Sequence, residues 1–151
     1  MSNHIAYIEN KDFTIYLSNF RKQVFDINIP EGISPGSAMT IISQIDNVYS
    51  QLRFDYGILQ SERSRVDSLI KEIERASATG KNETDRKKNA TDAVREYESD
   101  GKNFNLYKMY QQINYRYEMI DSLVDILEKK QSRLITLSGL LKLDKELSPG
   151  G

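Results

Sequence analysis

The fold is decided by residues 38–73, AMTIISQIDNVYSQLRFDYGILQSERSRVDSLIKEI. Apolar side chains recur in this stretch at alternating steps of four and three residues, from Ala38 to Ile73. Heptad spacing of this kind places one apolar seam along a single long helix. We expect this seam to join helices, either within one chain or between the copies of an oligomer. The predicted oligomerisation residues on it are Ile42, Ile45, Tyr49, Leu52, Tyr56 and Leu59.

A second heptad run begins at Leu106 and continues to Leu141. Its expected contact residues are Ile113, Tyr117, Ile120, Val124 and Leu127. Two seams separated by a polar, glycine-marked stretch predict an all-α, elongated helical hairpin with long coiled-coil-like helices. Because a narrow seam holds partners and supplies no pocket, we expect a homo-oligomer that associates with other molecules and is not an enzyme.

The segment before the first seam has a different pattern. Within residues 1–33, Phe13, Leu17, Phe20 and Val24 predict a small amphipathic helix of about three turns, and an extended segment follows it up to Pro30. Ser34 is placed to cap a first long helix over 35–78, with Pro35 in its first turn.

The predicted hairpin occupies residues 34–147, with breaks near 79–82 and 99–103. Gly80 is expected to end the first long helix, and Asn82 or Thr84 to cap a helical stretch over 82–99. The last helix is expected to start near Asn103, and residues 148–151 to form a frayed tail.

Composition narrows the classes of function. The 151 residues include 21 basic and 22 acidic ones, so bulk charge does not indicate a nucleic-acid binder. Cysteine is absent and His4 is the one histidine, which argues against thiolate metal sites, histidine-based zinc sites and a Ser-His-Asp triad. Neither a secretion signal nor an apolar run of membrane-spanning length is found, so we expect no membrane association and a cytoplasmic location.

Local basic clusters are the candidate sites. Four basic residues surround the predicted junction of the long helices, and four more lie towards the ends of those helices. Such side chains can contact the phosphates of a single strand without a groove or a sequence motif. The interleaved Glu83, Asp85 and Asp92 favour the alternative, a solvated helix face. The candidate DNA-binding residues are Lys71, Arg75, Lys81, Arg86, Lys87, Lys88, Lys130 and Arg133.

Polar and aromatic seam positions have two explanations each. Arg63 and Gln131 interrupt the seams, either to set register and oligomer state or because the seam splays and the side chains reach solvent. The seam tyrosines Tyr49, Tyr56, Tyr110 and Tyr117 could stack on bases, but at heptad spacing they are more typical of a core.

The order of these pieces resembles the UvsY-type recombination mediators of tailed bacteriophages. The resemblance spans about residues 17–147 and is one of layout with short local matches. The matching pieces are Lys22–Ile27 before the first long helix, Ser34–Leu52 at its opening, Leu69–Arg75 closed by Thr79–Gly80, Ser99–Asp100 at the second break, and Lys130–Arg133.

This resemblance implies a closed, ring-like homo-oligomer that binds single-stranded DNA. It also implies help in loading a RecA-like recombinase onto strands covered by single-strand-binding protein, without a cofactor. The chain departs from the family where Glu72 and Glu74 flank Lys71 and Arg75, so we expect DNA affinity to rest more on 81–88. The alternative function is a phage structural or assembly protein, such as a scaffold, a tail-assembly chaperone or a head–tail junction component.

Overall fold

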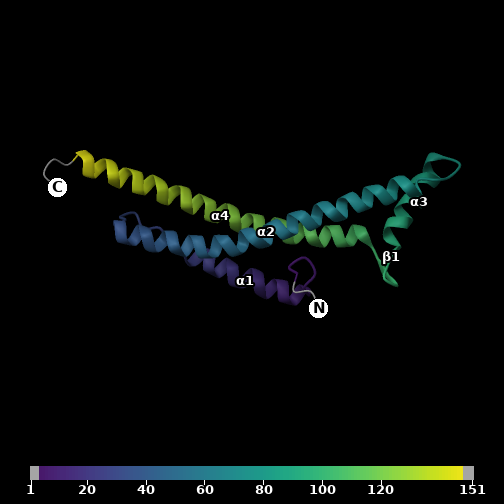
Figure 1. The fold of residues 1–151 in the computed structure, drawn as a ribbon, viewed down its shortest axis with the longest axis horizontal. Helices are drawn as coiled ribbons and strands as arrows, with labels where there is room; N and C mark the ends of the chain where they lie inside the picture. The colour runs from purple at the N-terminus through teal and green to yellow at the C-terminus, as the bar shows by residue number, and fades with distance from the viewer. Residues whose placement is uncertain (1–3, 148–151) are drawn as a thin grey trace. The chain divides into compact units, whose positions relative to one another are not determined.

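The computed structural model describes residues 4–147, and the predicted tail lies outside them. The described chain is mostly helical, as the heptad pattern predicts, and contains one short hairpin (Figure 1). Its elements are α1 Asn10–Asp26, α2 Pro35–Ser77, α3 Glu83–Arg95, β1 Tyr97–Ser99, β2 Lys102–Phe104 and α4 Leu106–Leu147.

Helix α2 begins and ends close to its predicted limits of 35 and 78. The Ser34 hydroxyl accepts a hydrogen bond from the backbone N–H of Ser37 at 3.2 Å, and Pro35 occupies the first turn. A serine cap satisfies one of the backbone donors left without a partner at a helix start. The predicted cap of the first long helix is therefore confirmed.

Helix α1 is longer than its apolar spacing predicts. It extends from Asn10 to Asp26, with Phe13 and Val24 buried, and so includes the start of the segment expected to be extended. Residues 27–30 lie outside helices and strands, and Ile27 is extended. The turn before Phe13 has no apolar pattern that would predict it from the sequence. It is helical because backbone hydrogen bonds extend the helix beyond its buried residues. The Phe13 N–H, for example, donates to the Glu9 carbonyl at 3.0 Å.

The expected helix over 82–99 and the start of the last helix near Asn103 are wrong in part. Helix α3 ends at Arg95, and residues 97–104 form an antiparallel hairpin that pairs Tyr97 with Phe104. Asp100 and Gly101 have φ of +54° and +74°, the combination that a two-residue type I′ turn needs. Helix α4 therefore begins only at Leu106, where the Asn105 side chain accepts from the Tyr107 N–H at 3.1 Å.

The chain divides into two compact units, each made of segments that are distant in the sequence. Unit 1 comprises Met1–Tyr7 and Gly57–Glu118, and unit 2 comprises Ile8–Tyr56 and Met119–Gly151. Each unit takes one half of α2 and one half of α4. Antiparallel long helices produce this division because the end of the first lies beside the start of the second.

Within unit 2, α1 and α4 pack against the first half of α2. Tyr16 on α1 donates a hydrogen bond to the buried Asp55 of α2, and Gln51 donates to the same carboxylate at 3.1 Å. Burial, followed by the bond to Asp55, raises the pKa of the Tyr16 hydroxyl. Tyr49 donates to Glu128 of α4 at 3.1 Å.

In unit 1, the N-terminal segment and α4 pack against the second half of α2. Arg116 is 1% exposed and donates to the Ile5 carbonyl at 2.9 Å. The seam position Arg63 donates to Asn114 at 3.1 Å, and its guanidinium carbon lies 3.8 Å from the centre of the Tyr117 ring. Arg63 thus contacts α4, whereas Gln131 is exposed, as a splayed seam would leave it.

These contacts show the seams packed within one chain, and whether the seams also join copies stays a prediction. Most of the residues predicted to join copies of the chain are buried within a single chain, and the seam tyrosines are half-buried. A side chain buried in this way offers no surface to a second copy in the same conformation. The buried ones are Ile45, Leu52, Leu59, Ile113, Ile120, Val124 and Leu127, while Ile42 is 44% exposed.

Candidate nucleic-acid interface

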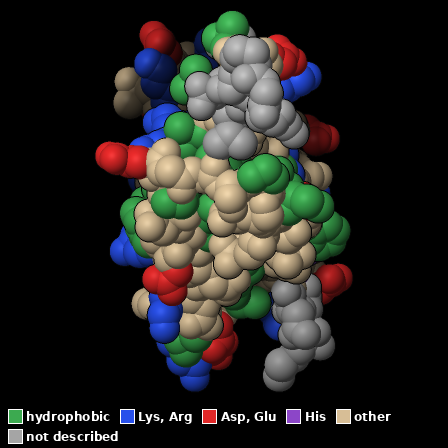
Figure 2. Space-filling model, turned by 90° about the vertical axis from the view of Figure 1, so that its left-hand side faces the viewer, with side chains coloured by type: hydrophobic (Ala, Val, Ile, Leu, Met, Phe, Trp, Pro, Cys, Tyr) green, Lys and Arg blue, Asp and Glu red, His purple; other side chains and the backbone are tan. Residues whose placement is uncertain are grey.

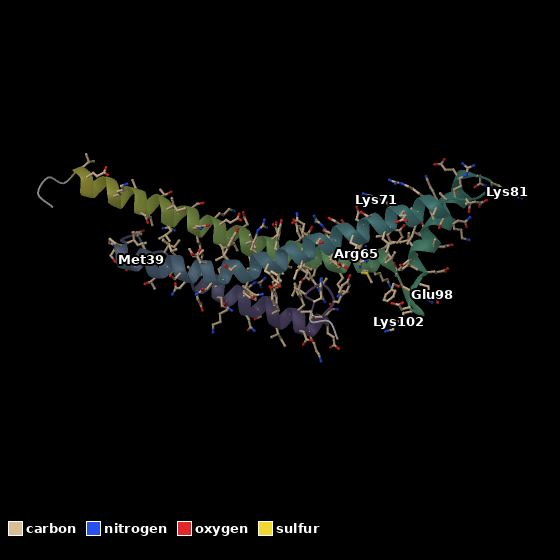
Figure 3. All side chains as sticks on the ribbon, in the orientation of Figure 1. Met39, Arg65, Lys71, Lys81, Glu98 and Lys102 are labelled. Carbon is tan, nitrogen blue, oxygen red and sulfur yellow. The ribbon has the colours of Figure 1, made fainter. Side chains whose placement is uncertain are left out.

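Six of the eight predicted DNA-binding residues lie together in unit 1. They occupy the end of α2, the loop 78–82 and the first turns of α3, and all six are exposed. Figure 3 labels two of them, Lys71 on α2 and Lys81 in the loop. We call this set the basic arc: Lys71, Arg75, Lys81, Arg86, Lys87 and Lys88.

Short-range contacts hold the loop of the basic arc. The Asn82 side chain caps α3 by accepting from the Asp85 N–H at 2.8 Å, which confirms the predicted cap. Arg86 and Asn89 donate back to the carbonyls of Gly80 at 3.3 Å and Thr79 at 2.6 Å. Because α3 bonds to the loop that precedes it, the direction in which α3 leaves α2 is set locally.

The basic arc carries a modest excess of positive charge. Residues 71–95 include seven basic and five acidic side chains, although the whole chain is close to neutral. Lys71 pairs with Asp67 at 2.8 Å, and the hydrogen bond to that carboxylate raises the pKa of the ammonium. Lys87 pairs with Glu83 at 3.0 Å. Exposed pairs of this kind are weak, so both lysines can exchange a carboxylate for a phosphate.

Four members of the basic arc have no acidic partner among the described residues, and one of these, Arg86, donates to the Gly80 carbonyl. Arg75, Lys81 and Lys88 make no ion pair among residues 4–147. Their charged groups are exposed to solvent and are available to a polyanion. Because long basic side chains on a surface can adapt to a flexible backbone, the arc suits a single strand better than a ligand of fixed shape.

Lys130 and Arg133 lie in unit 2, apart from the basic arc in the division of the chain. The Lys130 ammonium donates to the carbonyls of Val24 at 2.7 Å and Ile27 at 2.6 Å, at the C-terminus of α1. Burial lowers the pKa of this lysine. Its geometry is that of a helix cap, so the expected DNA contact at Lys130 is not supported. Arg133 is exposed on α4.

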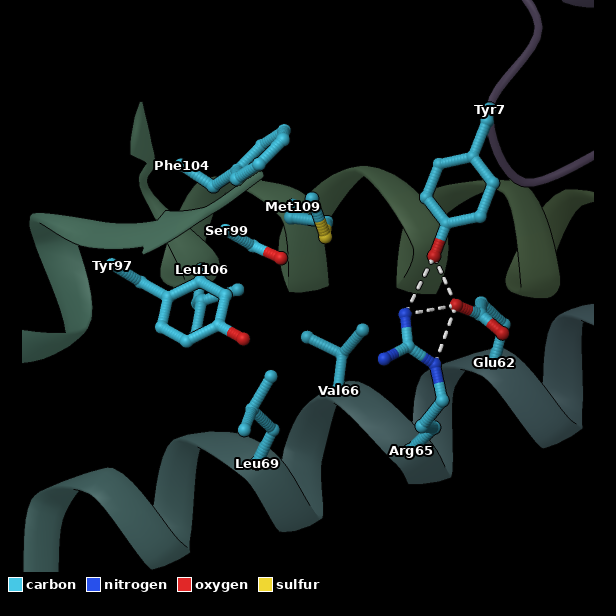
Figure 4. Close-up of a pocket in the computed structure, with 10 residues that line it drawn as sticks. All are labelled: Tyr7, Glu62, Arg65, Val66, Leu69, Tyr97, Ser99, Phe104, Leu106 and Met109. Atoms are coloured by element: carbon cyan, nitrogen blue, oxygen red, sulfur yellow. Dashed lines mark hydrogen bonds and ion pairs between the residues drawn. The ribbon is translucent and has the colours of Figure 1, made fainter. Parts of the chain in front are cut away.

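Unit 1 also contains a pocket that the heptad pattern of the sequence does not predict (Figure 4). It has a volume of about 380 Å³ and lies between the second half of α2, the hairpin and the start of α4. Apolar side chains from both long helices form its walls. The lining residues are Tyr7, Glu62, Arg65, Val66, Leu69, Tyr97, Ser99, Phe104, Leu106 and Met109.

Three polar side chains form one side of this pocket. The Tyr7 hydroxyl donates to Glu62 and accepts from Arg65 at 3.0 Å, while Arg65 Nε donates to Glu62 at 2.8 Å. Burial raises the pKa of Tyr7, and the bond to Glu62 adds to the rise. Burial alone would raise the pKa of Glu62, but the bonds from Arg65 and Tyr7 outweigh it and lower the pKa. The three side chains tie the N-terminal segment to α2.

The sequence pattern does not predict the pocket because its lining residues come from five segments: the N-terminal segment, α2, β1, β2 and α4. One signal was available in the sequence. The Asp100–Gly101 pair, with Tyr97 and Phe104 at equal distances on either side, is the strongest short-range indication of a hairpin. Nothing in the local pattern could have placed Tyr7 beside Glu62, because 55 residues separate them.

Comparison of the chain with protein families, curated proteins and solved structures found no match. Among residues 4–147, no group of three or more metal-ligating side chains could hold a metal ion. None of the helices over that same range is both long and apolar enough to cross a membrane.

Proposed function

We propose that this protein is a non-enzymatic recombination mediator. It binds single-stranded DNA as a homo-oligomer and helps to load a RecA-like recombinase onto strands covered by single-strand-binding protein. Several copies, each with a weak basic surface, would make a multivalent site for one strand. The proposal rests on the layout of the sequence and on one structural observation, the basic arc.

The basic arc supports the proposal through its exposure and its charge. All six side chains face solvent, four of them have no acidic partner among the described residues, and two are held only by exposed pairs. The arc also sits on a firm scaffold, because hydrogen bonds to the loop fix α3. Several exposed cations spread around one helix junction favour a polyanion over a small ligand.

Exposed apolar side chains support self-association. Figure 2 shows apolar groups at the surface, interleaved with charged ones. In unit 2, several large apolar residues are more than half exposed: Ile15, Phe25, Met39, Phe54, Ile135, Leu140 and Leu147. The same surface would equally serve a phage structural or assembly protein, so this observation does not separate the two functions.

Salt-dependent binding tests the proposed function. The wild-type protein should bind a labelled single-stranded oligonucleotide more tightly than a duplex of equal length, and affinity should fall as salt rises. Replacing Lys87 and Lys88 by glutamine should flatten the plot of log affinity against log salt by about 0.7 for each phosphate that the protein no longer neutralises. Fluorescence anisotropy measures both quantities.

The matched control changes two exposed lysines of α1. Lys11 pairs with Glu9 at 3.3 Å, which matches the pairing of Lys87 with Glu83, and Lys22 is exposed. The Lys11→Gln, Lys22→Gln variant removes the same charge from unit 2 and should keep the wild-type slope. An equal slope for both double variants would contradict a site at the basic arc. Absence of binding by the folded wild-type protein at low salt would favour the structural or assembly function.

A further inference from the structure

The hairpin gives the pocket of unit 1 an aromatic side and a polar side. Tyr97 and Phe104 lie directly opposite each other in the two strands, and both line the pocket. Ser99 lies two residues beyond Tyr97, so its side chain is on the same face of the hairpin. Figure 4 shows the oxygens of Tyr97 and Ser99 and the sulfur of Met109 directed towards the space between the walls.

A second hollow adjoins this pocket. It has a volume of about 330 Å³ and shares Tyr7, Phe104 and Met109 with the first. Its remaining lining is rich in amides and includes one lysine: Asn103, Asn105, Gln112 and Lys108. The two hollows are therefore neighbours that share Phe104 as a wall, and the exposed Lys108 lines the second.

We propose that the pocket takes one unpaired nucleobase of a single strand, with Lys108 on the neighbouring phosphate. The apolar and aromatic walls suit the faces of a planar heterocycle, and the Tyr97 and Ser99 hydroxyls suit its polar edge. A base paired in a duplex cannot enter such a pocket, so the site selects single strands. This inference rests on the proposed function for its biological ligand, but its chemistry can be tested alone.

Charge favours a nucleotide over an acidic or purely apolar ligand. Arg65 at the side of the pocket keeps more than half of its side chain exposed, although it bonds to Glu62 and Tyr7. Arg65 and Lys108 give the two hollows two cations against the single carboxylate of Glu62. The basic arc belongs to the same unit, so a strand bound there would stay attached to the body that carries the pocket.

Titration of the full chain with mononucleotides tests the pocket independently of the basic arc. Thymidine monophosphate should shift the backbone amide resonances of Tyr97, Ser99 and Phe104, whereas deoxyribose 5-phosphate, which lacks the base, should not. The Ser99→Phe variant fills the pocket and should abolish those shifts. The Ser68→Phe variant adds the same ring at an exposed position of α2 outside the pocket and should keep them.

An oligonucleotide experiment separates this inference from the proposed function. A strand of abasic sites keeps the phosphates, so it should bind the basic arc but at least about fivefold more weakly than oligothymidine, given the energy of base–aromatic stacking. The Ser99→Phe variant should bind the abasic strand and oligothymidine with equal affinity. Equal affinities in the wild-type protein, or no mononucleotide shifts at the hairpin, would overturn the base pocket. Only loss of binding to both strands would overturn the proposed function.

Discussion

At the scale of residues, Lys130 has a partner within the chain that the sequence does not predict. A lysine near the end of a long helix is consistent with phosphate binding, but its ammonium bonds to two carbonyls at the end of α1. The last carbonyls of a helix lack partners within the helix, and a cation there also suits the helix dipole. Lys130 therefore joins α4 to α1 within unit 2.

Replacing Lys130 by methionine should destabilise the fold without affecting DNA binding. The variant leaves the Val24 and Ile27 carbonyls without their charged donor, which should lower the free energy of unfolding by about 1–2 kcal/mol. Urea denaturation measures the loss. Lys129→Met is the neighbouring control, since Lys129 pairs only with Asp125 on the surface and should unfold like the wild type. A flatter salt slope in the Lys130 variant would restore its role as a DNA contact.

Glu62 should make the stability of unit 1 depend on acid pH. A carboxyl group whose pKa is lowered in the folded state stabilises the fold above its unfolded pKa, and this contribution is lost as pH falls through the folded pKa. The wild-type protein should therefore be more stable than Glu62→Gln at about pH 6, and the difference should shrink towards about pH 3. Denaturation at several pH values measures it. A constant difference would show that the carboxylate charge is not what stabilises the cluster.

At the scale of elements, the junction between α2 and α3 depends on one glycine. Gly80 has a φ of +147°, and a Cβ there would come within 2.7 Å of the Asp85 Cβ. Gly57, in contrast, lies within α2 with nothing near its missing side chain. Adding a Cβ is therefore unfavourable at Gly80 and is accommodated at Gly57.

Alanine substitution at these glycines should change stability in opposite directions. Gly80→Ala should lower the free energy of unfolding by about 1–3 kcal/mol, because it combines an unfavourable backbone angle with a close contact. Gly57→Ala should raise it by up to about 1 kcal/mol, since glycine is a poor residue within a helix. Thermal unfolding followed by circular dichroism gives both values. Stabilisation by Gly80→Ala would mean that the loop does not hold α3 as described.

At the scale of the whole molecule, α2 and α4 each contribute to two compact units. Their seams are largely buried inside one chain, and exposed apolar side chains offer a further surface for association between copies. Met39 and Ile135 are 72% and 65% exposed, and both belong to unit 2. Apolar side chains with this exposure are the ones that self-association would cover.

Polar substitution at this surface should reduce the oligomer without unfolding the chain. The Met39→Gln, Ile135→Gln variant should sediment at a lower mass than the wild type at the same concentration and keep its helical circular dichroism. Leu52→Ala, which opens a cavity in the buried seam, should instead lower the free energy of unfolding by about 2–5 kcal/mol. A wild-type protein that sediments as a monomer would remove the oligomer from the proposed function.

The sequence alone determined the local features. The heptad spacing established the two long helices, Ser34 and Asn82 marked two helix starts, and the basic residues around 81–88 marked a charged junction. Each of these depends on residues within a few turns of one another, which is why a linear pattern contains them.

The tertiary structure decided what each feature contacts. In the folded chain the seam residues are buried, the Lys130 ammonium caps α1, and Tyr7, Glu62 and Tyr97 line one pocket. These outcomes depend on pairings between residues tens of positions apart. A heptad records that a helix has an apolar face, but the same face can be buried by another helix of its own chain or by a second copy. The choice between them follows from packing in three dimensions.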